Sequence, residues 1–287
     1  MRTHTHTYRN ITATATAALT LALGGLALAA PAAPAAEPVA ASFVRENGEL
    51  TYKATPGQNN SLEISTEMEK RGEFEEYHIL TFRDQGELTI DPETAEWDEC
   101  VYPSPSDHTV VQCAVLAPQN SDDSDIYQVA LGDGDDSATV NADSDAYATL
   151  FGGAGDDTLT GSPSNVLKGE AGNDTLDGGG GVMGFGSYGG DGDDILTGCT
   201  YECLGGPGND SLTGTDEENI LRGESGKDTL RGGGGPDELF GGEQNDTLYG
   251  EAGDDTLWGN SGDDVLRGGA GKDTLSGGPG TDKVYQD

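Results

Sequence analysis

The chain has few positive charges. Of its 287 residues, 14 are Lys or Arg and 52 are Asp or Glu, which gives a formal net charge of −38. Proteins that bind nucleic acid through phosphate contacts need basic residues, so this composition excludes that class of protein. The excess of negative charge also opposes compaction unless cations are bound. We therefore expect cations, and not polyanions, as partners.

Residues that form common catalytic motifs are also scarce. Of four histidines, His4 and His6 lie close to the N-terminus, which leaves His78 and His108. The sequence contains no H-E-x-x-H metalloprotease motif and no G-x-S-x-G nucleophile motif. We expect His78 to lie in a strand and His108 in a loop, without a catalytic role. A small secreted hydrolase with a repeat tail is the less favoured alternative.

Long apolar runs are absent except near the N-terminus. Two arginines precede the apolar stretch Leu19–Leu28, which is followed by Ala- and Pro-rich residues. This order is typical of a secretory signal peptide, and cleavage after Ala29 or Ala35 fits its small-residue rule. We assign residues 1–36 to the signal, with an uncleaved membrane anchor as the alternative. The mature protein is then secreted and has no membrane span.

Cysteine is limited to four residues. In an exported chain, four cysteines indicate two disulfides, for which three connectivities exist. We expect pairing between neighbours in the sequence, Cys100 with Cys113 and Cys199 with Cys203.

Residues 37–120 contain no repeat and alternate apolar and polar residues, as short strands do. Asn47-Gly48, Pro56-Gly57 and Gln85-Gly86 have the composition of turns between such strands. The segment therefore predicts a β-rich leader region. Its length of about 85 residues is enough for a modest domain but small for most hydrolases.

Glycine and aspartate recur with a period of nine residues in the last third of the chain. Nine copies run from Gly205 to Tyr285 without a change of register, and Gly268–Ser276 is a typical copy. The copies follow G-G-x-G-x-D-x-U-x, in which U is a large apolar residue, and this is a calcium-binding nonapeptide pattern. Gly152–Thr160 is the first complete copy, and Gly132–Asp136 belongs to a degenerate one. The repeat predicts a solenoid over residues 121–287.

Fixed positions give each copy a turn and a strand. Glycines at positions 1, 2 and 4 permit positive φ, and positions 7 to 9 favour extended backbone. Alternation directs position 8 to one face, so we expect this core column: Leu212, Leu221, Leu230, Leu239, Leu248, Leu257, Leu266, Leu275 and Val284. One apolar side chain per copy is a small core. We therefore expect calcium, bound by turn carbonyls and aspartates, to stabilise the coil.

The copies resemble the hemolysin-type, or RTX, calcium-binding repeats over roughly residues 130–285. The resemblance implies an all-β fold, a right-handed parallel β-roll in which copy n stacks on copy n+2 and several Ca²⁺ lie between stacked turns. The implied metal ligands are backbone carbonyls and the position-6 aspartates, Asp157, Asp174, Asp194, Asp210, Asp228, Asp237, Asp246, Asp255, Asp264, Asp273 and Asp282. The leader resembles those that precede such repeats in exported actinobacterial proteins.

Two copies depart from this pattern, because Asn219 replaces the aspartate of one and Gln244 replaces the position-4 glycine of another. We expect sites that include them to be weak or empty, which leaves about five to seven ions in the nine continuous copies. The chain ends at Val284-Tyr285-Gln286-Asp287, without the family's secretion tail. We therefore expect export through the N-terminal signal, and an uncapped last coil that favours end-to-end self-association.

The side chains at position 9 point outward, so we expect them to contact their equivalents in neighbouring strands. Position 9 places Arg231, Tyr249, Arg267 and Tyr285 on one face, at a spacing that suits cation–π pairs, and Arg222, Phe240 and Trp258 on the other. We expect ordinary cross-strand pairing on both faces. The alternative is an exposed patch of Phe240 and Trp258 that binds a glycan or a protein. The position-5 residues Asp156, Asp193, Asp254 and Asp263 are expected to be solvated tips of the turns rather than ligands.

The repeat and the charge together favour one function. We expect a secreted, non-catalytic calcium-binding protein whose β-roll folds when several Ca²⁺ bind. The alternative is a calcium-dependent adhesion module that binds cell-surface glycan.

Overall fold

The computed structural model describes residues 39–71, 75–117, 125–179 and 185–286. The predicted signal, residues 1–36, lies outside the described residues. Residues from Glu37 onward form one compact unit, which is built on two sheets of twelve strands each. In the described part of the chain, no helix has the length and apolar character needed to cross a membrane.

The leader contributes six strands and one short helix. These elements are β1 (Val39–Glu46), β2 (Glu49–Ala54), β3 (Ser61–Lys70), β4 (Glu76–Arg83), β5 (Glu87–Ile90), α1 (Pro92–Trp97) and β6 (Val110–Leu116). The three predicted turns join β1 to β2, β2 to β3 and β4 to β5, which confirms them. Helix α1 was not predicted; it begins at Pro92, and Asp91 accepts the backbone N–H of Glu93 as its N-cap.

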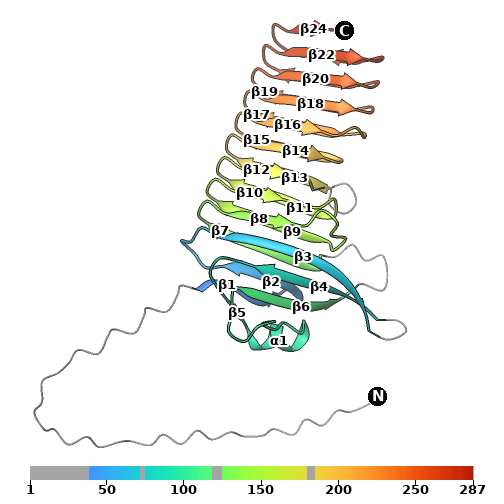
Figure 1. The fold of residues 1–287 in the computed structure, drawn as a ribbon. Helices are drawn as coiled ribbons and strands as arrows, with labels where there is room; N and C mark the ends of the chain where they lie inside the picture. Colours follow the sequence, from blue (N-terminus) through green and yellow to red (C-terminus); the bar gives the residue numbers. More distant parts are fainter. Residues whose placement is uncertain (1–38, 72–74, 118–124, 180–184, 287) are drawn as a thin grey trace, which may run out of the picture. The chain divides into compact units, whose positions relative to one another are not determined.

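The repeats contribute strands to the two sheets alternately. The first sheet contains β7 (Tyr127–Asp133), β9 (Ala148–Ala154), β11 (Asn165–Ala171), β13 (Phe185–Asp191), β15 (Glu202–Pro207), β17 (Ile220–Ser225), β19 (Glu238–Glu243), β21 (Thr256–Ser261) and β23 (Thr274–Ser276). The second contains β8 (Ser137–Val140), β10 (Thr158–Thr160), β12 (Thr175–Asp177), β14 (Ile195–Cys199), β16 (Ser211–Gly214), β18 (Thr229–Gly234), β20 (Thr247–Ala252), β22 (Val265–Ala270) and β24 (Lys283–Tyr285). Each strand pairs in parallel with the strand two places on, as Leu221 with Leu239 and Leu230 with Leu248 (Figure 1). The prediction of a parallel β-roll is confirmed.

The leader strands belong to the same two sheets as the repeats. Strand β2 pairs in parallel with β7, and β3 pairs in parallel with β8, as Ser61 with Ser137. The other leader strands extend the sheets mainly by antiparallel pairing, with β1 on β2 and β4 between β3 and β6. Both hydrogen-bond ladders therefore run from the leader into the roll without a break.

The core of the roll is the predicted column of leucines. Leu159, Leu167, Leu176, Leu196 and the position-8 leucines from Leu212 to Leu266 are fully buried. The prediction is wrong for the last two members, because Leu275 is only partly buried and Val284 is 47% exposed. Strands β23 and β24 are the outermost strands of their sheets, so no coil of the described chain covers these side chains.

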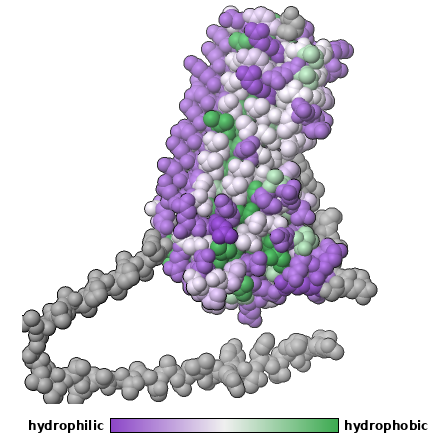
Figure 2. Space-filling view, in the orientation of Figure 1, coloured by the Kyte–Doolittle hydropathy of each residue, from purple (hydrophilic) through white to green (hydrophobic). Residues whose placement is uncertain are grey.

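Aromatic packing and disulfides add to the core outside that column. Phe43, Tyr52 and Phe82 of the leader and Tyr127 of β7 meet edge to face, at centroid distances of 4.8–5.7 Å. Both expected disulfides are present: Cys100–Cys113 in the leader, and Cys199–Cys203, which joins the end of β14 to the start of β15. Figure 2 shows hydrophilic residues gathered along the edge where the turns lie in Figure 1.

Candidate metal sites

The turns of the roll stack in two columns, one along each edge of the sheets. The first column holds the turns that lead into second-sheet strands, and its position-6 residues are Asp136, Asp157, Asp174, Asp194, Asp210, Asp228, Asp246, Asp264 and Asp282. The second column leads into first-sheet strands and has aspartates only at Asp237, Asp255 and Asp273 among the described repeats. The structure thus divides the eleven predicted ligands between two edges.

One oxygen of each carboxylate ties its coil to the coil before it. The backbone N–H of Asp228, for example, donates to Oδ1 of Asp246 at 2.9 Å. In the first column this ladder runs through Asn60, Asp136, Asp157, Asp174, Asp194, Asp210, Asp228, Asp246, Asp264 and Asp282, and in the second through Asn219, Asp237, Asp255 and Asp273. The aspartates are therefore held in position by the backbone of the neighbouring turn.

The second oxygen is buried and accepts no hydrogen bond from the described residues. This holds for Oδ2 of Asp136, Asp157, Asp174, Asp194, Asp210, Asp228, Asp237, Asp246, Asp255, Asp264 and Asp273. A buried polar atom without a partner costs free energy, so such a regular set indicates a ligand.

The glycine at position 1 makes room for this free oxygen. A Cβ added to Gly241 would collide with Oδ2 of Asp246 and would lie 2.7 Å from the carbonyl oxygen of Gly259 in the next coil. The same two oxygens, a carboxylate and a carbonyl, flank Gly152, Gly169, Gly189, Gly223, Gly232, Gly250 and Gly259. Any side chain at this position would displace the carboxylate.

The residues at positions 2 and 4 direct carbonyl oxygens at the next coil. A Cβ on Gly242 would collide with the carbonyl oxygen of Glu224, and one on Gly262 with that of Gln244. Both glycines have positive φ, 122° and 151°, which L side chains rarely adopt. The space between two stacked turns, called a gap from here on, is therefore bordered by backbone carbonyls and by the carboxylates of the two coils.

Burial disfavours the charged form of these carboxylates. Desolvation, with neighbouring carboxylates as a smaller cause, raises the pKa of Asp157, Asp210, Asp237 and Asp246 to about 7. The pKa of Asp136, Asp194 and Asp228 is raised to about 6, again mainly by burial. A nearby cation would favour the ionised form of these buried, mutually repelling carboxylates.

The donor atoms in these gaps fit calcium. They are all oxygens, carboxylate or carbonyl, and calcium prefers six to eight such ligands. In the described part of the chain, no three His, Cys, Asp or Glu side chains gather as a metal-binding group. A cation between the turns must therefore take backbone carbonyls as well as aspartates, which suits calcium better than zinc.

Asp136 was missing from the predicted ligands. It is 3% exposed, and its backbone N–H donates to Oδ1 of Asp157 at 2.8 Å, as in every later coil. Its copy was recognised as degenerate because Leu131 stands at position 1 and Ala138 at position 8. The Asp-Gly-Asp-Asp segment that ends at Asp136 was the signal that could have identified it.

The position-5 aspartates lie outside the gaps. Asp156, Asp193, Asp254 and Asp263 are exposed, and each accepts a backbone N–H from the next coil, as Asp263 does from Thr281 at 2.8 Å. The prediction that they are solvated tips is confirmed.

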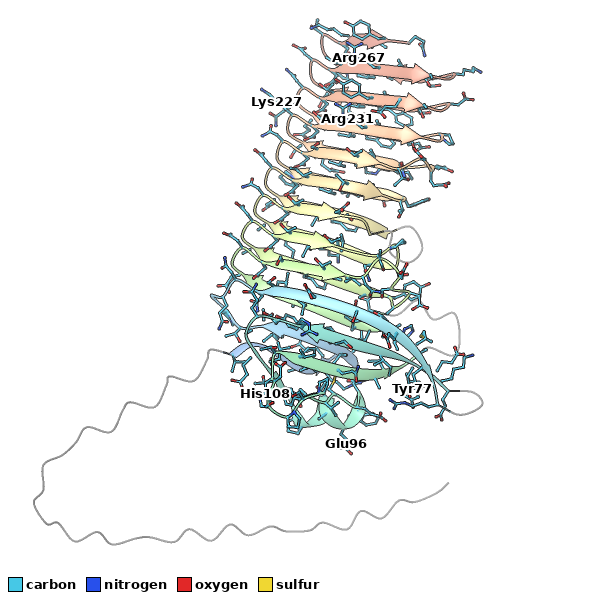
Figure 3. All side chains as sticks on the ribbon, in the orientation of Figure 1. Tyr77, Glu96, His108, Lys227, Arg231 and Arg267 are labelled. Carbon is cyan, nitrogen blue, oxygen red and sulfur yellow. A yellow bond between two sulfur atoms is a disulfide. The ribbon has the colours of Figure 1, made fainter. Side chains whose placement is uncertain are left out.

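Cross-strand contacts at position 9 follow the predicted pairs. Arg231 lies 4.3 Å from the ring of Tyr249, and Arg267 lies 4.5 Å from the ring of Tyr285 (Figure 3). On the first sheet Arg222 lies over Phe240, whose ring stacks on Trp258 at 4.4 Å and 9°. Both rings are half-buried. Ordinary strand pairing therefore accounts for the two aromatic side chains.

The two histidines of the leader lie in different surroundings. His78 is buried in β4, and burial lowers its pKa. His108, labelled in Figure 3, lines a hollow of about 390 Å³, stacks on Tyr102 and bonds to Glu87 at 3.2 Å. The nearby hydroxyl of Ser106 pairs with Ser104 instead of with His108. The hollow therefore lacks an activated nucleophile of the serine–histidine type.

Comparison with known families identifies the repeats. The family model of the RTX calcium-binding nonapeptide repeat matches in four copies, at residues 151–182, 204–239, 232–266 and 258–285. No curated protein matches the chain. The matched segments contain all the predicted ligands except Asp194. Residues 151–182 and 204–285, which form much of the parallel β-roll, therefore carry RTX calcium-binding nonapeptide repeats.

Proposed function

We propose that this chain is a secreted, non-catalytic calcium-binding protein whose β-roll folds when several Ca²⁺ bind between its stacked turns. The observation that carries the proposal is the column of buried carboxylate oxygens without partners. At eight of the turns a backbone carbonyl of the next coil faces the same position-1 glycine as this oxygen, and the repeats are of a family that binds calcium.

The proposed ligands are the position-6 aspartates of both columns together with the carbonyls of their turns. They comprise the eleven predicted residues and Asp136, which has the same contacts. Because the first column continues below Gly205 with unchanged geometry, the whole roll offers more sites than the five to seven expected for the nine regular copies. When bound, calcium supplies the positive charge that these carboxylates lack.

The requirement for a cation follows from the small core. A single fully buried leucine per copy contributes about 1.5–3 kcal/mol, whereas ordering nine residues of backbone costs about 9–18 kcal/mol. Backbone hydrogen bonds narrow this difference. Ligand binding to the folded state alone adds stability in proportion to the number of filled sites, so calcium shifts the equilibrium towards the roll.

Folding that depends on calcium would suit an exported protein. The N-terminal residues have the order of a signal peptide, and both cysteine pairs form disulfides, as is common outside the cytosol. Extracellular calcium-binding modules bind with dissociation constants of about 10⁻⁴–10⁻³ M. The repeats would therefore remain unfolded where calcium is low and fold after export.

Equilibrium dialysis of the full chain against calcium, with magnesium as the control, tests the proposal. We expect several calcium ions per chain at millimolar concentration and no comparable uptake of magnesium, because magnesium demands a tighter octahedral shell. Uptake of fewer than two calcium ions per chain would refute the proposal.

A further inference from the structure

Three asparagines occupy the place that aspartate occupies in the other turns. Asn60 directly precedes β3, Asn219 directly precedes β17, and Asn165 is the first residue of β11. Their exposed fractions are 4%, 0% and 0%, so they are buried as deeply as the aspartates. A ligand lost by random change to asparagine would leave an unpaired amide N–H, whereas Nδ2 of each of these three residues donates a hydrogen bond. Oδ1 of Asn60 is buried and has no partner among the described residues.

Each of the three side chains donates to a backbone carbonyl of the chain segment below it. Nδ2 of Asn219 donates to the carbonyl oxygen of Cys199 at 2.8 Å, Nδ2 of Asn165 to Ala146 at 3.3 Å, and Nδ2 of Asn60 to Ala40 at 3.2 Å. The oxygen of Asn219 keeps the aspartate's position beside the position-1 glycine, Gly214, and accepts the N–H of Thr215 at 2.8 Å.

The aspartates face a backbone N–H, not a carbonyl. Below Asp237 lies the backbone N–H of Asn219, which donates to Oδ1 at 2.8 Å, and the aspartates above it repeat this contact. An ionised carboxylate can only accept a hydrogen bond, whereas an amide can both donate and accept. The choice between aspartate and asparagine therefore matches the group that the turn below presents, an N–H or a carbonyl.

Two of the asparagines, Asn60 and Asn219, also stand where the carboxylate columns begin. Asn60 lies directly below Asp136, the first aspartate of the first column, and Asn219 lies directly below Asp237, the first of the second. Below Asn219 the turn is closed by the Cys199–Cys203 disulfide, and two coils further down Asn165 accepts the hydroxyl and N–H of Ser162. These lower turns are closed by covalent and hydrogen bonds.

We propose that Asn60 and Asn219 are end stops of the two metal columns, and that the side-chain amides of Asn60, Asn165 and Asn219 bind the carbonyl that would otherwise face a cation. Calcium binding in the second column then starts above Asn219. The part of this inference that concerns calcium rests on the proposed function. The complementarity of amide and carbonyl does not depend on it.

Substitutions at Asn219 in the full chain test the inference, with Asp246 as the matched control. At residue 219 we expect the melting temperature in saturating calcium to be highest for the native asparagine, lower for Asn219→Ala and lowest for Asn219→Asp. The Asn219→Asp chain should melt below the native chain by about 5 °C or more. The carboxylate would face the Cys199 carbonyl without a proton between them. Calcium bound per chain should not rise. At Asp246, where the turn below presents an N–H, the native aspartate should melt highest and both Asp246→Asn and Asp246→Ala should bind less calcium.

The opposite result at Asn219 would overturn the inference. If Asn219→Asp binds one additional calcium ion and melts at or above the native temperature, asparagine is only a lost ligand. Asn165→Asp gives a second test at an independent turn, with the same expected loss, if Asn219→Asp does not fold. A native chain that binds no calcium refutes the proposed function, whereas the order of melting temperatures at residue 219 still decides the role of the amide.

Discussion

Oδ1 of Asp246 accepts the backbone N–H of Asp228 at 2.9 Å, whereas Oδ2 of the same carboxylate is buried and has no hydrogen-bond partner among the described residues. One oxygen fixes the side chain in the stack, and the other remains available to a ligand. Because the repeat reproduces this contact coil after coil, a line of such oxygens follows each edge of the roll. The predictions below depend on this division of roles.

Removal of one carboxylate should weaken calcium binding locally. In Asp246→Ala the gaps on both sides of the turn lose a ligand, so we expect at least one fewer calcium ion per chain and a melting temperature in calcium about 3–6 °C lower. Isothermal titration calorimetry and thermal melts measure both effects. Asp263→Ala is the control, since Asp263 is exposed at position 5 and should retain full stoichiometry. Equal losses in the two variants would contradict the assignment.

A methyl group at position 1 should be as damaging as loss of the ligand. The Cβ of Gly241→Ala would collide with Oδ2 of Asp246, a residue held by backbone on both sides. We expect a loss of about 1–3 kcal/mol of stability in calcium, measured by urea denaturation. Glu243→Ala, an exposed change in the same turn, should be nearly neutral. A Gly241→Ala chain as stable as the native one would show that the position-1 space has no role.

The calcium requirement should depend on pH. Burial raises the pKa of Asp210, Asp237 and Asp246 to about 7 from the ordinary aspartate value of 3.8, so the metal-free roll loses stability as pH rises from about 4 to 7 and the carboxyls ionise. Calcium needs the ionised form, so protons compete with it below about pH 7. Because protons also stabilise the folded roll over this range, we expect the calcium concentration at half-folding to fall, and the folded roll to bind calcium less tightly, as pH falls from 8 to 5. Circular dichroism titrations at several pH values measure it, and a midpoint that does not change over this range would contradict the role of these aspartates.

The stacked aromatics should contribute to stability rather than to recognition. Replacing Phe240 and Trp258 together with serine removes a stacked pair and the cation–π contact of Arg222, at a cost of about 1–2 kcal/mol. Thermal melts in calcium measure the loss, and a glycan-binding assay on the same variant is the control. Loss of glycan binding without loss of stability would instead support the adhesion module.

The fold of the roll could be predicted from the sequence because its signal is periodic. Leucine at position 8 and aspartate at position 6 recur in phase, and stacking brings identical positions together, as Leu221 with Leu239. The role of Asp136 could not be read in this way, because Leu131 and Ala138 replace the two residues that mark the phase. Its place became apparent only from its contact with Asp157.

The leader shows a different limit of prediction. Alternation identified its strands, but period-two patterns do not specify partners, so the parallel pairing of β2 with β7 and of β3 with β8 was not foreseen. The roles of Asn60 and Asn165 depend on that three-dimensional pairing and on which backbone group faces each side chain. No local pattern in the sequence encodes this information.

Removal of calcium from the folded full chain is the most direct test of the central claim, that bound cations rather than the apolar core stabilise the roll. Amide spectra and limited proteolysis should be recorded in calcium, after chelation, and after return of calcium or magnesium. We predict that chelation collapses the amide dispersion of the repeats and exposes them to protease, and that calcium alone restores both. A chelated chain that keeps its dispersed spectrum and its protease resistance would contradict the account.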